Sequence, residues 1–253
     1  MPRFVEIAQT ASTNSLMLSQ APGLAHGTVI FTPCQTAGRG QRGNRWLAAP
    51  GQNATFSMLL RPASLAARDQ FVVSEVASLA VCDTLSSLSG RDDLRVKWPN
   101  DVYCGDRKIC GILIENSLRG VEVDYAVVGI GINVNQREFD PYAPNPTSLA
   151  LIARGEFDPV GVMAEVCRRI ERQWAGFEAD PAGVRVEVHR RYVNRLYRHD
   201  GGFYPFALPD GTAFDACIAG VEPDGTLGLR LADGTVNTYA FKQVQHIINN
   251  TTL

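Results

Sequence analysis

One segment of the chain combines the residue types that bind a negatively charged ligand carrying an aromatic ring. Residues Gly38 to Trp46 include three glycines, three arginines and one tryptophan, and no carboxylate. Glycines let main-chain amides approach phosphate oxygens closely, and guanidinium groups match such oxygens with paired hydrogen bonds. The indole of Trp46 offers a flat face to a base. The segment therefore predicts a nucleotide-binding loop.

The spacing of the three glycines also matches the fingerprint of dinucleotide-binding dehydrogenases. That motif opens a helix and is followed about 20 residues later by an acid for the ribose. Here Pro50 would interrupt such a helix, and no Asp or Glu occurs between Thr36 and Arg68. A P-loop is also excluded, because no Gly-Lys-Ser/Thr ends the segment. The alternative to a nucleotide site is a surface loop whose arginines are merely solvated.

A second group of candidate residues lies around Lys108, at the start of an apolar run. Lys108 could reach a phosphate or a carboxylate, and Gly111 leaves room for a ligand against a strand. Asn100 and Asp101 end the preceding segment, Lys97 to Asp101. Short polar side chains commonly form a turn at such a position. For these two residues a role in chemistry and a simple turn both stay open.

Two glycines interrupt an apolar strand just before Asn133. Gly129 and Gly131 alternate with isoleucines there. Glycine weakens a strand unless another group must approach the backbone closely. Either a bound ligand or a tightly packed helix would explain both positions.

The periodicity of the chain predicts the elements that must position these residues. We expect strands over 4–7, 27–33, 53–60, 94–98, 108–115 and 121–134, and helices over 12–21, 65–88, 158–174 and 182–196. Residues 38–46 are expected to form a loop between two strands. Beyond residue 202, Asp-Gly turns recur about every ten residues, which predicts a small antiparallel barrel. The pattern is that of an α+β fold.

The composition is that of an ordinary globular protein of 253 residues, 45% of them hydrophobic. Lys and Arg total 24 against 26 Asp and Glu, and the net charge of -2 argues against a general binder of nucleic acid or membrane surfaces. We expect a cytoplasmic protein, because neither a signal peptide nor a long apolar span is present. The six cysteines are expected to be reduced and mostly buried, and no metal site is expected from the spacing of Cys and His.

Taken together, the motifs resemble those of biotin protein ligases. Six segments occur in the order and spacing of that family: Ser12-Thr13-Asn14, Gln35, Gly38 to Trp46, Lys97 to Asp101, Lys108 with Gly111 to Glu115, and Gly129 to Asn133. The resemblance implies a mixed β-sheet with helices on one face, of the class II synthetase and biotin ligase type, followed by a small SH3-like β-barrel. The implied domains are a catalytic biotin- and ATP-binding ligase domain over 1–199 and an SH3-like domain over 203–253.

The resemblance also implies a two-step acyl transfer. The biotin carboxylate attacks the α-phosphate of ATP to form biotinyl-5'-AMP, and a lysine of a biotin carboxyl carrier protein, a subunit of an acyl-CoA carboxylase, then captures the biotin. Lys108 and Arg39 would offset charge as two anions meet. Asp101 would receive or orient the lysine amine, which must lose a proton to attack.

The residues implied to bind the substrates form two sets. Those for biotin are Ser12, Thr13, Asn14, Gln35, Arg39, Gly40, Gln41, Lys108 and Gly111. Those for the nucleotide are Arg39, Arg42, Trp46, Asn100 and Asn133. Mg²⁺ is expected from ATP chemistry, because it screens the triphosphate, but no ligands for it can be assigned from the sequence.

This chain departs from the family at two points. Position 41 is Gln where several members have Arg, which affects any salt bridge there and how tightly an adenylate is retained. Only eleven residues precede Ser12, so we expect no helix-turn-helix domain and no binding to DNA. The remaining expectations for partners are no membrane, and a monomer or homodimer.

Two other functions are alternatives to a biotin protein ligase: one has the same fold, and the other has the same ligand. A lipoate protein ligase is the nearest, and the segment Gly38 to Trp46 and the run Lys97 to Asp101 favour biotin over it. A noncatalytic biotin-binding module would have lost a charged catalytic residue, whereas Lys108 and Asp101 are both present.

Overall fold

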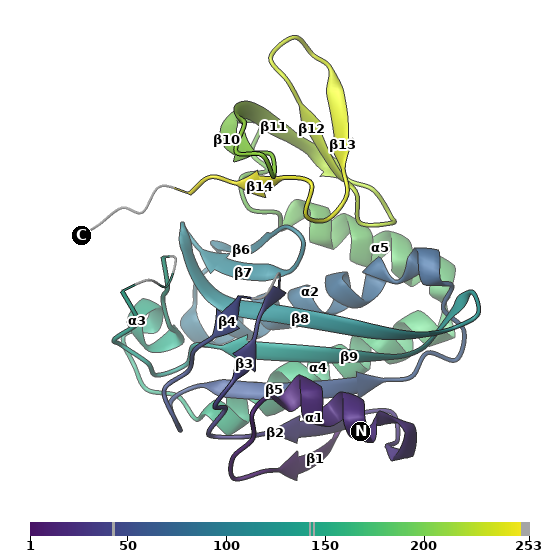
Figure 1. The fold of residues 1–253 in the computed structure, drawn as a ribbon, viewed down its shortest axis with the longest axis vertical. Coiled ribbons are helices and arrows are strands. Elements are labelled where there is room, and N and C mark those ends of the chain that lie inside the picture. The colour runs from purple at the N-terminus through teal and green to yellow at the C-terminus, as the bar shows by residue number, and fades with distance from the viewer. Residues whose placement is uncertain (42–43, 142, 144, 249–253) are drawn as a thin grey trace.

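The larger sheet of the protein is mixed and has seven strands (Figure 1). The computed structural model describes residues 1–41, 44–141, 143 and 145–248. The strands lie in the order β1-β2-β5-β9-β8-β7-β6. β1 and β2 pair in parallel, and the other neighbours pair antiparallel. The bounds are β1 Arg3–Glu6, β2 Thr28–Phe31, β5 Ala54–Leu60, β6 Leu94–Lys97, β7 Asp101–Cys104, β8 Arg107–Arg119 and β9 Glu122–Ile132.

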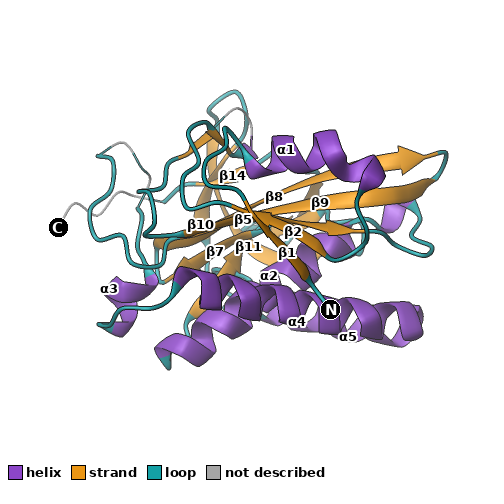
Figure 2. Ribbon diagram, turned by 90° about the horizontal axis from the view of Figure 1, so that it is seen from below, coloured by secondary structure: helices purple, strands orange, loops and turns teal. Residues whose placement is uncertain are grey.

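Long helices cover one face of this sheet, and a short helix lies across the other (Figure 2). α2, α4 and α5 form the covering layer, whereas α1 packs against β5 and β9 from the opposite side. The predicted mixed sheet with helices on one face is confirmed, and α1 marks the face that carries the site. The bounds are α1 Thr13–Gln20, α2 Phe71–Ser89, α3 Leu149–Ala153, α4 Pro159–Ala179 and α5 Pro181–Asn194.

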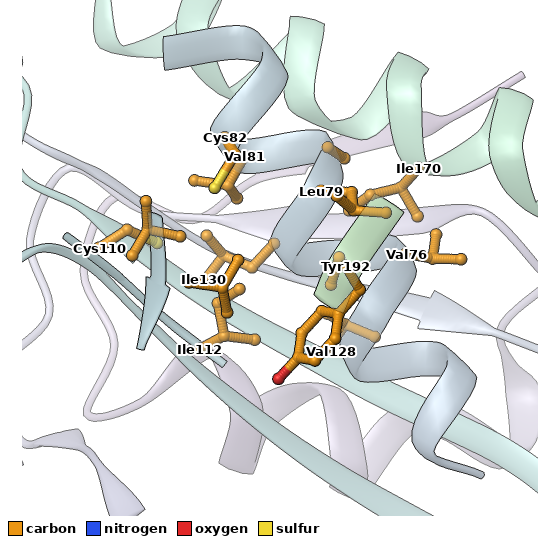
Figure 3. Close-up of a cluster of buried hydrophobic side chains, with 14 of the residues drawn as sticks. Val76, Leu79, Val81, Cys82, Cys110, Ile112, Val128, Ile130, Ile170 and Tyr192 are labelled. Atoms are coloured by element: carbon orange, nitrogen blue, oxygen red, sulfur yellow. The ribbon is translucent and has the colours of Figure 1, made fainter. Parts of the chain in front are cut away.

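The hydrophobic core lies between the sheet and these helices, around α2 (Figure 3). Val76 and Leu79 of α2 are fully buried, as are Ile112 and Ile130 of the sheet to within 2%. Most of α2 is buried because it packs against the sheet as well as α4 and α5. By length and composition Ala67–Ser89 could also cross a membrane, but 78% of its apolar window is buried in this core.

The C-terminal part forms a second, antiparallel sheet of five strands in the order β13-β12-β11-β10-β14. The expected Asp-Gly turns are present: Gly211, Gly225 and Gly234 have positive φ angles, which glycine adopts without strain. The predicted SH3-like unit is confirmed. Its strands are β10 Tyr204–Ala207, β11 Ala213–Val221, β12 Leu227–Arg230, β13 Val236–Tyr239 and β14 Gln245–His246.

Three short strands were not expected from the sequence. β3 Gly38–Arg39 and β4 Arg45–Trp46 pair within the segment predicted to be a loop, and β7 lies where only turns were expected. Such short strands carry too little periodicity to be recognised locally, because their pairing depends on neighbours. All six cysteines are free, and five of them are buried.

Candidate active site

A cavity of about 260 Å³ lies on the face of the sheet that carries α1. Its walls come from α1, the segment 38–46, β8, β9 and the C-terminal sheet. A second, more open cavity of about 790 Å³ adjoins it, and Arg39, Gly40 and Gln41 line both. Residues far apart in the sequence therefore share one cleft system.

The polar end of the first cavity is built at the N-terminus of α1. Ser12 is the N-cap of this helix, and its hydroxyl accepts a hydrogen bond from Ser15 N. Thr13 N donates to Gln35 Oε1 at 2.9 Å. Ser12 and Thr13 are buried and line the cavity together with Gln35. The structure thus brings together side chains whose polar groups could satisfy a polar ring inside the cavity.

Asn14 explains the glycine at position 129. A Cβ built on Gly129 would lie 2.0 Å from Asn14 Oδ1, so only glycine leaves space for this amide. Asn14 Oδ1 accepts from Ser57 Oγ at 2.5 Å, and Asn14 Nδ2 donates to Leu113 O at 3.0 Å. Of the two explanations left open by the sequence, the packed helix accounts for Gly129.

Trp46 explains the glycine at position 131. Gly111 and Gly131 are register partners on β8 and β9, and the indole of Trp46 lies over both. A Cβ at Gly131 would lie 2.4 Å from Trp46 Cε2, and one at Gly111 would lie 3.1 Å from Cζ3. Within the described part of the chain, the buried Nε1 of Trp46 has no hydrogen-bond partner. The ring forms one wall of the first cavity.

Lys108 and Asp101 pair with each other in the lining of this cavity. Lys108 Nζ lies 2.6 Å from Asp101 Oδ2, and both side chains are about three-quarters buried, being 24% and 25% exposed. Backbone hydrogen bonds to Asn145 and Thr147 hold Lys108 at the start of β8. The cation and the carboxylate are therefore placed together, both facing the cavity.

The glycine-arginine segment, residues 38–46, is held to the sheet by Arg39 and Gln41. Arg39 Nη2 lies 2.5 Å from Glu115 Oε2, and Gln41 Nε2 donates to Asn100 Oδ1 at 2.8 Å. Gly40 N donates to Asn44 O at 2.7 Å, which closes the tip. Arg42, predicted to bind the nucleotide, lies outside the described residues.

The two asparagines predicted to face a nucleotide differ in their surroundings. Asn100 is buried and lines the second cavity. Asn133 is buried as well, but it lines neither cavity, and its Nδ2 donates to Thr147 O at 2.9 Å. Through this hydrogen bond Asn133 holds the segment whose Thr147 N donates to Lys108 O.

Sequence reasoning missed the contribution of the C-terminal sheet. Phe241 and His246 line the first cavity, and Trp98 Nε1 donates to Gly225 O at 2.9 Å, which joins the two sheets. Burial and the charge of Lys97 lower the pKa of His246 well below its usual range, so this wall is neutral. No local signal links Trp98 to Gly225, because 127 positions separate them along the chain.

Tyr103 of β7 and Cys110 of β8 carry ionisable groups whose pKa values are both raised. Burial, followed by the charge of Asp101, raises the pKa of the Tyr103 hydroxyl, and burial raises the pKa of the Cys110 thiol well above its usual range. Neither is suited to act as a nucleophile at neutral pH. Among the residues described, no group of three or more His, Cys, Asp or Glu could hold a metal ion.

Comparison with known proteins agrees with this site. The sequence profile of the Biotin/lipoate A/B protein ligase family matches residues 5–133, half of the chain. A stretch of 131 residues is 41% identical to a Biotin--[acetyl-CoA-carboxylase] ligase of Paracoccus denitrificans, covering 51% of this chain and 53% of that protein. A stretch of 153 residues is 35% identical to the ligase of the same name from Mycobacterium tuberculosis, covering 58% and 56%. The chain thus spans about half the length of these relatives.

The fold agrees over nearly the whole chain with a solved biotin protein ligase from Aquifex aeolicus in complex with biotin and ATP. The TM-score is 0.80 at 24% identity, covering 98% of this chain and 100% of the other. At this identity the likeness shows the fold. The family expected from the motifs is confirmed: the chain belongs to the biotin/lipoate A/B protein ligase family.

Proposed function

We propose that the protein is an ATP-dependent biotin protein ligase. The observation that carries this proposal is one cavity lined both by the polar groups of Thr13 and Gln35 and by the pair of Lys108 and Asp101. The names of the relatives from Paracoccus denitrificans and Mycobacterium tuberculosis support biotin as the acid and the carboxylase as the source of the acceptor.

In the first step, a carboxylate oxygen of biotin attacks the α-phosphorus of ATP, and pyrophosphate leaves. Lys108, which lines the first cavity, would contact both the carboxylate and the α-phosphate, and so offset the charge that develops between them. Arg39 would contact the same anions from the glycine-arginine segment. The polar end of the cavity would hold the ring of biotin through Ser12, Thr13, Asn14 and Gln35, with Gly40, Gln41 and Gly111 alongside.

In the second step, the amine of a carrier lysine attacks the acyl carbon, and AMP leaves. The amine must lose a proton, and Asp101, a carboxylate in the lining of the first cavity, would accept that proton or orient the amine. Trp46 and Asn100 would contact the nucleotide. Asn133 was expected to face the nucleotide as well, and its hydrogen bond to Thr147 O supports a second role, in holding the segment next to Lys108.

Mg²⁺ would accompany ATP and screen its phosphates. The two carboxylates closest to the site, Asp101 and Glu115, already pair with Lys108 and Arg39. We therefore assign no ion to protein ligands.

The division into domains and the cellular context belong to the same proposal. The ligase domain would span 1–199 and the SH3-like domain 203–253, which is supported by the end of α5 at Asn194 and the start of β10 at Tyr204. We propose a cytoplasmic monomer or homodimer whose partner is a biotin carboxyl carrier protein, and which binds neither DNA nor membranes.

Exchange of labelled pyrophosphate into ATP tests the function directly. We expect exchange only when biotin is added. Exchange that does not depend on biotin, or that requires lipoate instead, would overturn the proposal in favour of another activity. Biotin binding without any exchange would indicate the noncatalytic module.

A further inference from the structure

Glu115 of β8 holds two of the candidate binding residues through a single oxygen atom. Its Oε2 accepts a hydrogen bond from Arg39 Nη2 at 2.5 Å and another from Asn14 Nδ2 at 2.9 Å. Hydrogen bonds with an ionised partner are about twice as strong as neutral ones. The glycine-arginine segment and the start of α1 are therefore tied to one point on the sheet.

Asn14 is the rigid side of this arrangement. It is 4% exposed, its amide also contacts Ser57 and Leu113, and it fills the space above Gly129. The side chain of Arg39, in contrast, is 43% exposed. The carboxylate is thus positioned by Asn14, and Arg39 is the residue that the carboxylate positions.

The direction of the contact matters for the reaction. Arg39 lines both cavities, whereas Glu115 lines only the second one. Arg39 therefore belongs to both cavities, and its carboxylate partner belongs to the lining of the second. A guanidinium carries five N–H donors in one plane, and the contact with Glu115 uses Nη2, which leaves other donors of the fork for an anion in the first cavity.

We propose that Glu115 is a positioning residue that holds Arg39 against the carboxylate of the acid substrate and couples that end of the site to α1. This inference rests on the proposed function. Glu115 itself does not contact the substrate. The alternative is a partly exposed ion pair of no consequence, as many such pairs are.

The variant Glu115→Gln removes the charge that holds Arg39 but keeps an oxygen for Asn14. The matched control is Asp124→Asn, which breaks the ion pair with Arg119 at the far end of the same hairpin. In biotin-dependent pyrophosphate exchange we expect Glu115→Gln to raise the KM for biotin about tenfold, the size of one charge-assisted hydrogen bond. The kcat and the KM for ATP should change less, and the control should match the parent.

A double-mutant cycle separates a role through Arg39 from a merely structural one. In an Arg39→Gln background, adding Glu115→Gln should change the KM for biotin less than about twofold, because its effect passes through the missing guanidinium. Where turnover is too slow for a KM, calorimetric titration gives the Kd for biotin in the same set of variants. An equal loss in both backgrounds, or an unchanged KM in Glu115→Gln alone, overturns the proposal.

Trypsin cleavage of the free protein tests the contact without any substrate. We expect cleavage after Arg39 or Arg45 to be faster in Glu115→Gln than in the parent and in Asp124→Asn. Unchanged cleavage overturns the positioning of Arg39 by Glu115. A parent protein that shows no biotin-dependent exchange and no biotin binding contradicts the proposed function instead, so the two failures are distinct.

Discussion

The indole ring of Trp46 lies directly against the main chain of Gly131, where a Cβ would come within 2.4 Å of the ring. Gly111, the register partner of Gly131, contacts the same ring from the neighbouring strand. Two facing glycines thus make a flat patch on the sheet. Because Trp46 ends the glycine-arginine segment, this contact determines where that segment meets the site.

Gly131→Ala tests this contact. The added methyl group must displace the indole, which is proposed to contact the nucleotide, so we expect the KM for ATP in pyrophosphate exchange to rise at least about tenfold. Gly176→Ala in α4 is the control, because a Cβ there meets nothing within 4 Å. It should leave the kinetics unchanged and stabilise the helix by roughly 0.5–1 kcal/mol. A normal KM for ATP in Gly131→Ala would show that the ring is free to move.

Lys108→Ala should abolish adenylate formation while biotin still binds. The cation contacts the groups whose charge develops as the carboxylate attacks, so its loss should slow exchange by roughly 100-fold or more. Calorimetry measures biotin binding separately. Arg119→Ala, at the exposed end of the same strand, should behave like the parent. Adenylation at the normal rate in Lys108→Ala contradicts the assignment.

Asp101→Asn should slow transfer to the carrier more than adenylation. The amide keeps the size of the side chain but cannot take a proton from the amine, and loss of such a base costs about 100-fold or more in rate. Single-turnover transfer from preformed biotinyl-5'-AMP and pyrophosphate exchange report the two steps. Because Asp101 also pairs with Lys108, a small change in exchange is expected. Equal losses in both steps would refute a role confined to transfer.

Stability should depend on pH through a contact away from the site. His189 Nδ1 lies 2.6 Å from Oε1 of the buried Glu75, and this hydrogen bond raises the pKa of His189 above its usual value of 6.5. The stabilisation is therefore fully present below the unfolded pKa and is lost as the pH rises through the folded pKa. We expect the free energy of unfolding in urea to decrease as the pH rises from about 6 through the raised pKa of His189.

His189→Gln should remove most of this decrease and destabilise the protein at low pH by roughly 1–3 kcal/mol, because the carboxylate of Glu75 loses a charged partner. His199→Gln, a change in the same part of the chain that does not touch Glu75, should keep the pH dependence. If the decrease persists unchanged in His189→Gln, other groups carry it.

Much of the architecture could be predicted from local patterns. α2 and the hairpin of β8 and β9 are long and apolar, so their periodicity is clear. The helix start at Asp158-Pro159 is confirmed by the hydrogen bonds that the side chain of Asp158 accepts from Val160 N and Gly161 N. The short β3, β4 and β7 could not be predicted. Two to four residues carry no period, and their pairing depends on strands elsewhere in the chain.

The site shows the same division between local pattern and tertiary contact. The residues around Ser12, Gln35, Lys108 and Gly111 were found from motifs, and the structure brings them to one cavity. The hydrogen bonds that join Asn133 to Thr147 and Arg39 to Glu115 could not be predicted. A motif states which residue types occur together, whereas the partner of an amide or a carboxylate depends on which chain segment lies beside it.

By itself, the sequence determined the family, the mixed sheet with its C-terminal barrel, and the candidate residues, because periodicity, glycine spacing and motif order are written along the chain. Only the tertiary structure decided that Asn14 and Trp46 account for Gly129 and Gly131. It also decided that Glu115 pairs with Arg39, and that residues of the C-terminal sheet line the cavity. These contacts join positions far apart along the chain. Close packing and hydrogen-bond geometry, which act over a few ångströms in space, select them.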